Sequence, residues 1–232
     1  RRFGVQTRAA KFTDVPGHTR GIVPLLAEAG VQFLHIGVNP GSAVPKVPPL
    51  FRWQDSSGAE VVVMYESGYG SAFALPGGRA ALAFGHSIDN LGPQDEAEVA
   101  GIFAHLRAEF PGAQVSAGRL DDYAQALLAA QDRLPVVTDE IGDTWIHGAG
   151  SDLVKMRRYR ALLRLRQTWL ENGKTTPASL RGFSRKLLMV AEHTWGMDEK
   201  TYLADHENFT AAQFQAARLG EKFRRFESSW SE

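Results

Sequence analysis

The stretch Thr13-Asp14-Val15-Pro16-Gly17-His18-Thr19 decides the fold, because it places a carboxylate at a tight turn directly before an amphipathic helix. Apolar residues recur at helical spacing over 22–29, Gly30 ends that pattern, and the apolar run 31–38 predicts a buried strand. Alternating strands, loops and helices are typical of an α/β barrel, whose functional groups lie at the carboxyl ends of strands. The sequence therefore predicts that Asp14 faces a barrel mouth, although aspartate is also favoured where it only starts a helix.

Length and composition narrow the possible classes of protein. The 232 residues are 44% hydrophobic, which is enough to bury a substantial core in one domain or in two small ones. Basic and acidic residues number 26 each, so the composition favours neither a nucleic-acid partner nor an anionic membrane. The absence of cysteine excludes disulfides and thiolate metal sites. No apolar run approaches the roughly 20 residues that span a bilayer.

The alternation of strands and helices continues along the first 150 residues. A turn at 55–58 between two β-rich runs predicts a hairpin. The Gly-rich stretch 68–78 lacks the spacing and the lysine of a phosphate loop, so we assign it to substrate access or simple connection. The remaining predicted elements are strands at 51–53, 60–65, 81–84, 114–117 and 134–137 and helices at 95–110 and 121–131.

Polar and aromatic residues occur in two turn-prone loops, 85–93 and 138–148, each directly after a predicted strand. Both loops are expected on the same face of the fold as Asp14. Asp89 is the second candidate carboxylate. The other candidates that these loops supply are His86, Trp145 and His147. Loops commonly contain polar groups that do no chemistry, so a turn or packing role stays open for each.

From residue 151 onward the pattern changes to helices alone. The expected helices are 151–172, 180–192 and 210–226. The predicted domains are accordingly 1–150, a barrel part, and 151–232, a helical bundle. Leucines interleave with the arginines of the first helix, so the arginine run predicts a solvated face and not a nucleic-acid stripe. His193 and Trp195 follow the second helix, where a lone histidine is more often a packing residue than a ligand.

Four segments, in the same order along the chain, resemble the α-mannosidases of glycoside hydrolase family 38 and their relatives. Residues 14–19 are similar to the Asp-Pro-Phe-Gly-His-Ser motif, and 84–93 to the loop with the acid/base aspartate. Residues 134–155 resemble the Leu-Pro-Val, Glu-Leu and His-Arg-Gly segment that closes the barrel and enters a three-helix bundle. Residues 187–198 look like the bundle's Leu-Leu-x-Asn-Gln-Phe-His-Asp segment with its glycine turn. The resemblance covers most of the chain.

The resemblance implies an α/β fold: a partial (β/α)7-type barrel of the family 38/57 kind followed by a three-helix bundle. It implies a retaining, zinc-dependent hydrolase of α-linked, mannoside-like glycosides. Asp14 would attack the anomeric carbon and contact the zinc, and Asp89 would act as general acid and then as base. His193 would be a zinc ligand, and His18 would orient the Asp14 loop. The substrate-binding residues that it implies are Trp145, His147, Trp195 and His86.

The chain also departs from the family pattern. The family's first strand carries a His-x-Asp pair that supplies two further zinc ligands, and nothing before Asp14 matches it. Because residues 1–5 include neither an initiator Met nor a signal-peptide pattern, we expect the chain to begin inside a longer protein that holds those ligands. The isolated fragment is then expected to be inactive. Thr194 and Glu192 stand where the family has aspartate and an aromatic residue, so the sugar need not be mannose.

Two alternatives stay open beside the glycosidase. A metal-dependent carbohydrate deacetylase also uses aspartate and histidine at a barrel mouth, and it would leave aryl glycosides intact. A non-catalytic relative would bind carbohydrate without turnover. Each alternative has a carbohydrate as partner and involves neither nucleic acid nor a membrane. The sequence leaves the linkage, the compartment and the oligomeric state open.

Overall fold

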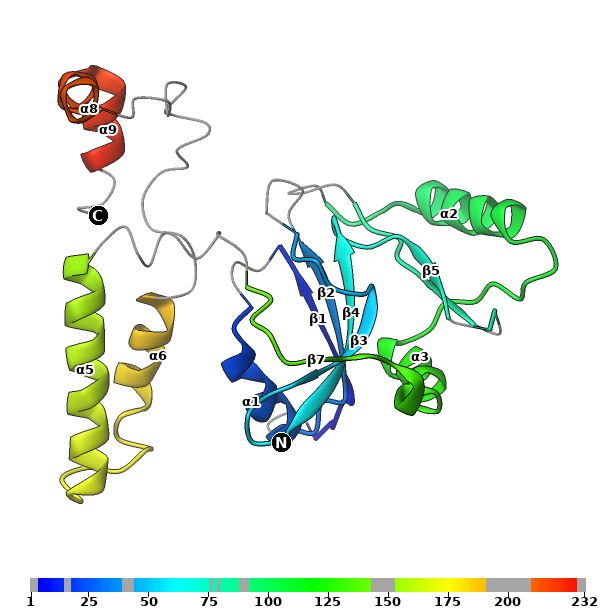
Figure 1. Ribbon diagram of the computed structural model, residues 1–232, viewed down its shortest axis with the longest axis horizontal. Coiled ribbons are helices and arrows are strands. Elements are labelled where there is room, and N and C mark those ends of the chain that lie inside the picture. Colours follow the sequence, from blue (N-terminus) through cyan, green and yellow to red (C-terminus); the bar gives the residue numbers. More distant parts are fainter. Residues whose placement is uncertain are drawn as a thin grey trace. The chain divides into compact units, whose positions relative to one another are not determined.

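The computed structural model describes residues 4–14, 18–38, 44–75, 77–78, 80–87, 92–142, 153–190 and 210–228. The chain divides into two compact units, Arg1–Thr144 and Trp145–Glu232. The first unit holds all the strands found in the described ranges, and the second holds helices (Figure 1). None of the helices in these ranges is long and apolar enough to cross a membrane.

The first unit is built on a five-stranded sheet with the strand order β1-β2-β4-β3-β7. Its strands are β1 (Ala9–Thr13), β2 (Phe33–Val38), β3 (Leu50–Gln54), β4 (Glu60–Ser67) and β7 (Val136–Val137). The pairs β1–β2, β2–β4 and β3–β7 are parallel, whereas β3 and β4 form the expected antiparallel hairpin. In the part of the chain that the structure describes, β1 and β7 are the two edges of this sheet. A mostly parallel α/β sheet is therefore confirmed, but a closed barrel is not seen.

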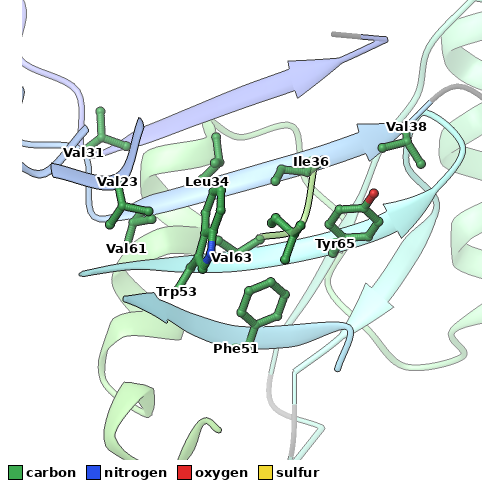
Figure 2. Packing of buried hydrophobic residues seen from close by; sticks show 11 residues of the cluster. Val23, Val31, Leu34, Ile36, Val38, Phe51, Trp53, Val61, Val63 and Tyr65 are labelled. Atoms are coloured by element: carbon green, nitrogen blue, oxygen red, sulfur yellow. The ribbon is translucent and has the colours of Figure 1, made fainter. Parts of the chain in front are cut away.

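Strand β2 lies inside the sheet, between β1 and β4, and all six of its residues are buried. Such a strand needs cover on both faces, which is usual in parallel sheets. On one face Leu34 and Ile36 pack with Trp53 and with Val23 of helix α1 (Val23–Glu28), as Figure 2 shows. On the other face, residues of β2 and β4 pack with Leu127 of helix α3 (Leu120–Leu128). The sheet is thus a middle layer between α1 and α3.

Helix α1 is confirmed close to its expected place, after a 3-10 helix at Arg20–Ile22. The Thr19 hydroxyl accepts a hydrogen bond from the Gly21 amide at the start of this helical segment. Gly30 follows the last turn with a φ of +84°, in the left-handed region that favours glycine. The chain then enters β2 directly, which makes the predicted strand–loop–helix–strand unit.

Helix α2 (Glu96–Glu109) begins where its sequence predicts. Asp95 accepts a hydrogen bond from the Glu98 amide at 2.8 Å, and the Glu98 carboxylate accepts one from the Asp95 amide at 2.9 Å. This reciprocal capping box satisfies amide groups that would otherwise be unpaired at the helix start. Helix α3 is also confirmed, with a 3-10 helix at Gln131–Arg133 taking the place of its expected last turn.

Three predictions about the strands are corrected. Strand β6 (Ala81–Ala83) exists, but it pairs with β5 (Ala72–Ala74) in a separate two-stranded antiparallel sheet, and β5 was expected to be a connection. The strand expected at 114–117 is wrong, because that stretch has irregular backbone and pairs with none of the described strands. Strand β7 runs parallel to β3 and therefore in the opposite direction to β1, β2 and β4. Its carboxyl end lies on the other side of the sheet from theirs. The expectation that it exits on the Asp14 side is therefore wrong.

The second unit contains α5 (Leu153–Glu171), α6 (Arg181–Val190), α8 (Ala211–Arg218) and α9 (Glu221–Ser228). Helices α5 and α6 pack through Trp169 and Phe183, whose ring centroids are 6.2 Å apart, and the Arg166 Nε donates to Ser184 Oγ at 2.8 Å. The single helix expected over 210–226 is wrong, because the helix is interrupted at Leu219 and Gly220, between α8 and α9. The helical character of this unit is confirmed.

Candidate active site at the carboxyl edge of the sheet

Asp14 lies directly after β1, on the side of the sheet where the parallel strands β1, β2 and β4 end; this side is called the carboxyl edge below. Its amide donates a hydrogen bond of 3.0 Å to the Gly37 carbonyl of β2, which continues the β1–β2 ladder by one residue. Its φ is +55°, and in the described ranges it is the only residue other than glycine with a positive φ. Residues other than glycine rarely adopt this conformation, although aspartate tolerates it better than most, and such positions gather at functional sites.

Gly37 brings the turn after β4 to the same edge. A Cβ atom on Gly37 would lie 2.8 Å from the Gly68 carbonyl oxygen and 3.0 Å from the Tyr69 Cα. No side chain fits at these distances, so the Gly68–Tyr69 backbone packs directly on the end of β2. Gly37 thus contacts both Asp14, through its carbonyl, and the turn that contains Gly68 and Tyr69, called the Tyr69 turn below.

His86 also contacts this turn. Its Nε2 lies 3.3 Å from the Gly70 carbonyl and its Nδ1 lies 3.1 Å from the Ser87 carbonyl. Its ring meets the Tyr69 ring edge-on, with centroids 6.1 Å apart, and the side chain is exposed. The structure thus brings the predicted residues Asp14 and His86 to one edge, where Tyr69 and Gly37 lie between them.

A partly buried polar cluster, formed by Lys11, His35, Glu66 and Ser71, lies on three neighbouring strands and on the turn that contains Tyr69. His35 is completely buried, and its Nε2 is 2.6 Å from Glu66 Oε2. Lys11 Nζ lies 3.2 Å from His35 Nδ1 and donates to the Tyr69 carbonyl at 2.8 Å. The Ser71 hydroxyl and amide donate to the other Glu66 oxygen at 2.6 and 3.2 Å. The cluster therefore fastens the Tyr69 turn to the sheet.

The charges of the cluster follow from its contacts. Burial raises the pKa of the Glu66 carboxyl, but hydrogen bonds from His35 and Ser71 outweigh this and lower it to about 2. Burial lowers the pKa of His35, and the Lys11 charge lowers it further against the effect of Glu66. At neutral pH, Glu66 is ionised and His35 is neutral, so His35 donates from Nε2 to Glu66 and accepts from Lys11 at Nδ1.

Strand register explains how the sequence builds this cluster. The β1–β2 register pairs Lys11 with His35, and the β2–β4 register pairs Gly37 with Glu66, two residues along on the same face. Sequence analysis missed all of these residues. The available signal is His35 itself, because a histidine inside an apolar, fully buried strand needs hydrogen-bond partners.

The segment after β7 returns toward the Asp14 edge. The Arg20 amide donates to the Glu140 carboxylate at 2.6 Å, and the Arg20 guanidinium donates to the Thr138 carbonyl. A Cβ on Gly142 would lie 3.2 Å from the His18 carbonyl oxygen. His18 is buried and stacks on Phe12, with centroids 5.8 Å apart and ring planes 13° apart. Although β7 ends at the other edge, the chain up to Gly142 therefore runs back beside His18.

Several predicted site residues lie outside the described residues: Asp89, Trp145, His147, His193 and Trp195. Within the described ranges, no three histidine or acidic side chains come close enough together to hold a metal ion. Of the two zinc ligands that the resemblance implies, only Asp14 is described. The residues that the structure describes do not make a zinc site by themselves.

Comparisons with known proteins give a partial family match and a weak structural likeness. A family model described as Domain of unknown function (DUF5054) matches residues 149–232, which is less than half of the chain. No curated protein matches the chain. Among solved structures, an alpha-mannosidase from Enterococcus faecalis V583 is weakly similar, with a TM-score of 0.49 and 13% sequence identity. That match covers 99% of this chain and 29% of the mannosidase chain, so this chain spans less than a third of its length.

Proposed function

We propose that this chain is part of a retaining glycoside hydrolase in which Asp14 is the nucleophile. The observation that carries the proposal is the position of Asp14 directly after a parallel strand, with a positive φ and its amide bonded to the neighbouring strand. A carboxylate whose backbone is fixed in this way can be aimed at a reacting carbon at little entropic cost. The four motifs that resemble α-mannosidases of glycoside hydrolase family 38 support the same role.

In the proposed reaction, the Asp14 carboxylate attacks the anomeric carbon while the bond from that carbon to the leaving oxygen breaks. Asp89 protonates the leaving oxygen, and a glycosyl ester forms on Asp14. Asp89 then removes a proton from water, which attacks the same carbon and frees Asp14. Such a mechanism needs two carboxyls roughly 5 Å apart, one ionised and one protonated at the start.

The end of the sheet where Asp14 lies carries side chains that suit a sugar better than a small apolar ligand. Tyr69 offers an aromatic ring and His86 an exposed imidazole at the same edge. Glu66 is not proposed as the acid, because three donors already occupy its oxygens and its low pKa keeps it ionised. The further sugar-binding residues in the proposal are Trp145, His147 and Trp195.

Zinc dependence is part of the proposal, with Asp14 and His193 as ligands. A bound zinc ion would supply Lewis-acid chemistry and hold sugar hydroxyls. Replacement of His193 by Ala in the full-length protein is expected to lower the zinc content measured by elemental analysis while circular dichroism shows unchanged helix content. Unchanged zinc content in that variant would remove His193 from the metal site.

The test follows product stereochemistry in the full-length protein. With 4-nitrophenyl α-mannoside as substrate, NMR should show that the first product keeps the α configuration, and Asp14→Asn should abolish turnover. Asp132→Asn, which changes an exposed carboxylate on a 3-10 helix, is the control and should keep full activity. An inverted product contradicts the nucleophile role. Release of acetate from acetylated sugars without cleavage of the aryl glycoside would favour a deacetylase instead.

A further inference from the structure

Lys11 is a cation whose direct contacts in the described part of the chain are all with neutral groups. Its Nζ donates to the Tyr69 carbonyl at 2.8 Å and to the neutral His35 Nδ1 at 3.2 Å, and it lies 4.4 Å from the centroid of the Phe84 ring. Glu66 lies on the far side of the His35 ring, bonded to the other imidazole nitrogen. Among the residues with described positions, no carboxylate oxygen forms an ion pair with Lys11.

The Lys11 ammonium is also held in place. Glu66 fixes the His35 proton on Nε2, which leaves Nδ1 as an acceptor for Lys11, and Ser71 holds Glu66 in turn. The Phe84 ring packs against both His35 and Lys11, with 4.3 Å between the Phe84 and His35 ring centroids. A lysine ammonium has three N–H donors, and two of them have these partners. The side chain is exposed, so the third donor can meet a ligand.

We propose that Lys11 binds an acidic group on the substrate, so that the substrate of the proposed hydrolase is an acidic glycoside carrying a carboxylate. This inference rests on the proposed function. An oxyanion that meets a partly desolvated, pre-positioned ammonium forms a charge-assisted hydrogen bond that is stronger than one in bulk water. It also supplies the counter-charge that the described contacts of Lys11 lack.

Lys11 lies on β1, and Asp14 directly follows that strand. Lys11 precedes Asp14 by three residues, which at about 3.3 Å per residue places their Cα atoms about 10 Å apart along the strand. Burial lowers the pKa of Lys11, with Glu66 opposing this, so binding should weaken in alkaline solution as the ammonium loses its proton.

The experiment compares three probes by calorimetry with the full-length protein at pH 7. The probes are methyl α-mannoside, the methyl glycoside of mannuronic acid and inorganic phosphate. The uronate should bind at least tenfold more tightly than the neutral glycoside, and Lys11→Met should remove that difference. Lys46→Met, which removes an exposed lysine from the segment before β3, is the matched control and should keep it. Lys11→Gln keeps a donor for the Tyr69 carbonyl and should lose the preference without a loss of thermal stability.

The possible results separate this inference from the proposed function. Equal affinity for uronate and neutral glycoside, or a preference that survives both Lys11 variants, overturns the inference. Tight binding of phosphate alone, without preference for the uronate, also overturns it, because the ligand is then a free oxyanion. Asp14→Asn should abolish hydrolysis and keep the Lys11-dependent preference. A protein that shows the preference but cleaves no glycoside refutes the proposed function alone.

Discussion

Replacement of Gly37 by Ala tests whether the end of β2 and the Tyr69 turn are packed as closely as the site requires. The new Cβ would lie 2.8 Å from the Gly68 carbonyl oxygen and 3.0 Å from the Tyr69 carbonyl carbon and Cα. All of these are backbone atoms, which cannot rotate away as a flexible side chain would. Strand β2 is itself held between β1 and β4, so the turn must move outward.

The expected cost is about 1–3 kcal/mol of unfolding free energy, the range for one extra carbon forced into a closely packed place. Movement of Tyr69 also weakens the 2.8 Å hydrogen bond from Lys11 to its carbonyl, so the preference for an acidic glycoside should fall as well. The free energy of unfolding is measured from the urea-induced unfolding transition of the first unit. The preference is measured by the calorimetric comparison of uronate and neutral glycoside.

Gly101→Ala is the matched control, because Gly101 lies inside helix α2 and a Cβ added there would have nothing within 4 Å outside the helix's own backbone. Alanine is about 0.5–1 kcal/mol more favourable than glycine in a helix interior, so this variant should be slightly more stable. If Gly37→Ala changes stability by less than about 0.5 kcal/mol, the typical range for surface substitutions, the close packing argued for Gly37 is refuted.

Three further outcomes are expected. Because the folded-state pKa of His35 is lowered from 6.5, stability should be constant above that pH and fall below it, where the unfolded chain binds a proton on His35 that the folded protein does not. Denaturation at pH 7 and pH 5 tests this, and His35→Phe should lose the slope. Glu66→Gln should cost about 1.5–3 kcal/mol, measured by urea denaturation, because it removes charge-assisted hydrogen bonds in a partly buried cluster. Asp89→Ala should slow glycosides with poor leaving groups far more than aryl glycosides in steady-state kinetics, and equal losses would make Asp89 structural.

Local sequence signals predicted much of the fold. The apolar run of β2, the turn between β3 and β4, and the capping box of α2 each act over a few neighbouring residues, and each element formed where expected. The elements that were predicted wrongly depend on pairing with strands that are distant in the sequence. Strand β5 forms only because β6 pairs with it, and the direction of β7 depends on its pairing with β3.

The same distinction applies to the site. The position of Asp14 at the end of a strand could be predicted because its motif and the end of β1 are local in sequence. The cluster of Lys11, His35 and Glu66 could not, because it depends on the registers of β1, β2 and β4, which sequence periodicity does not fix. His35 was the one local hint, as a polar residue in a buried strand.

The most direct test of the central claim is to trap the covalent intermediate on Asp14. The full-length protein is incubated with a 2-deoxy-2-fluoro glycosyl fluoride, which forms the glycosyl ester and slows its hydrolysis, and is then digested and analysed by mass spectrometry. We expect one added sugar per chain, on the peptide that contains Asp14, and no label in Asp14→Asn. A label on another carboxylate, or an active enzyme that is never labelled, would contradict the assignment of Asp14 as the nucleophile.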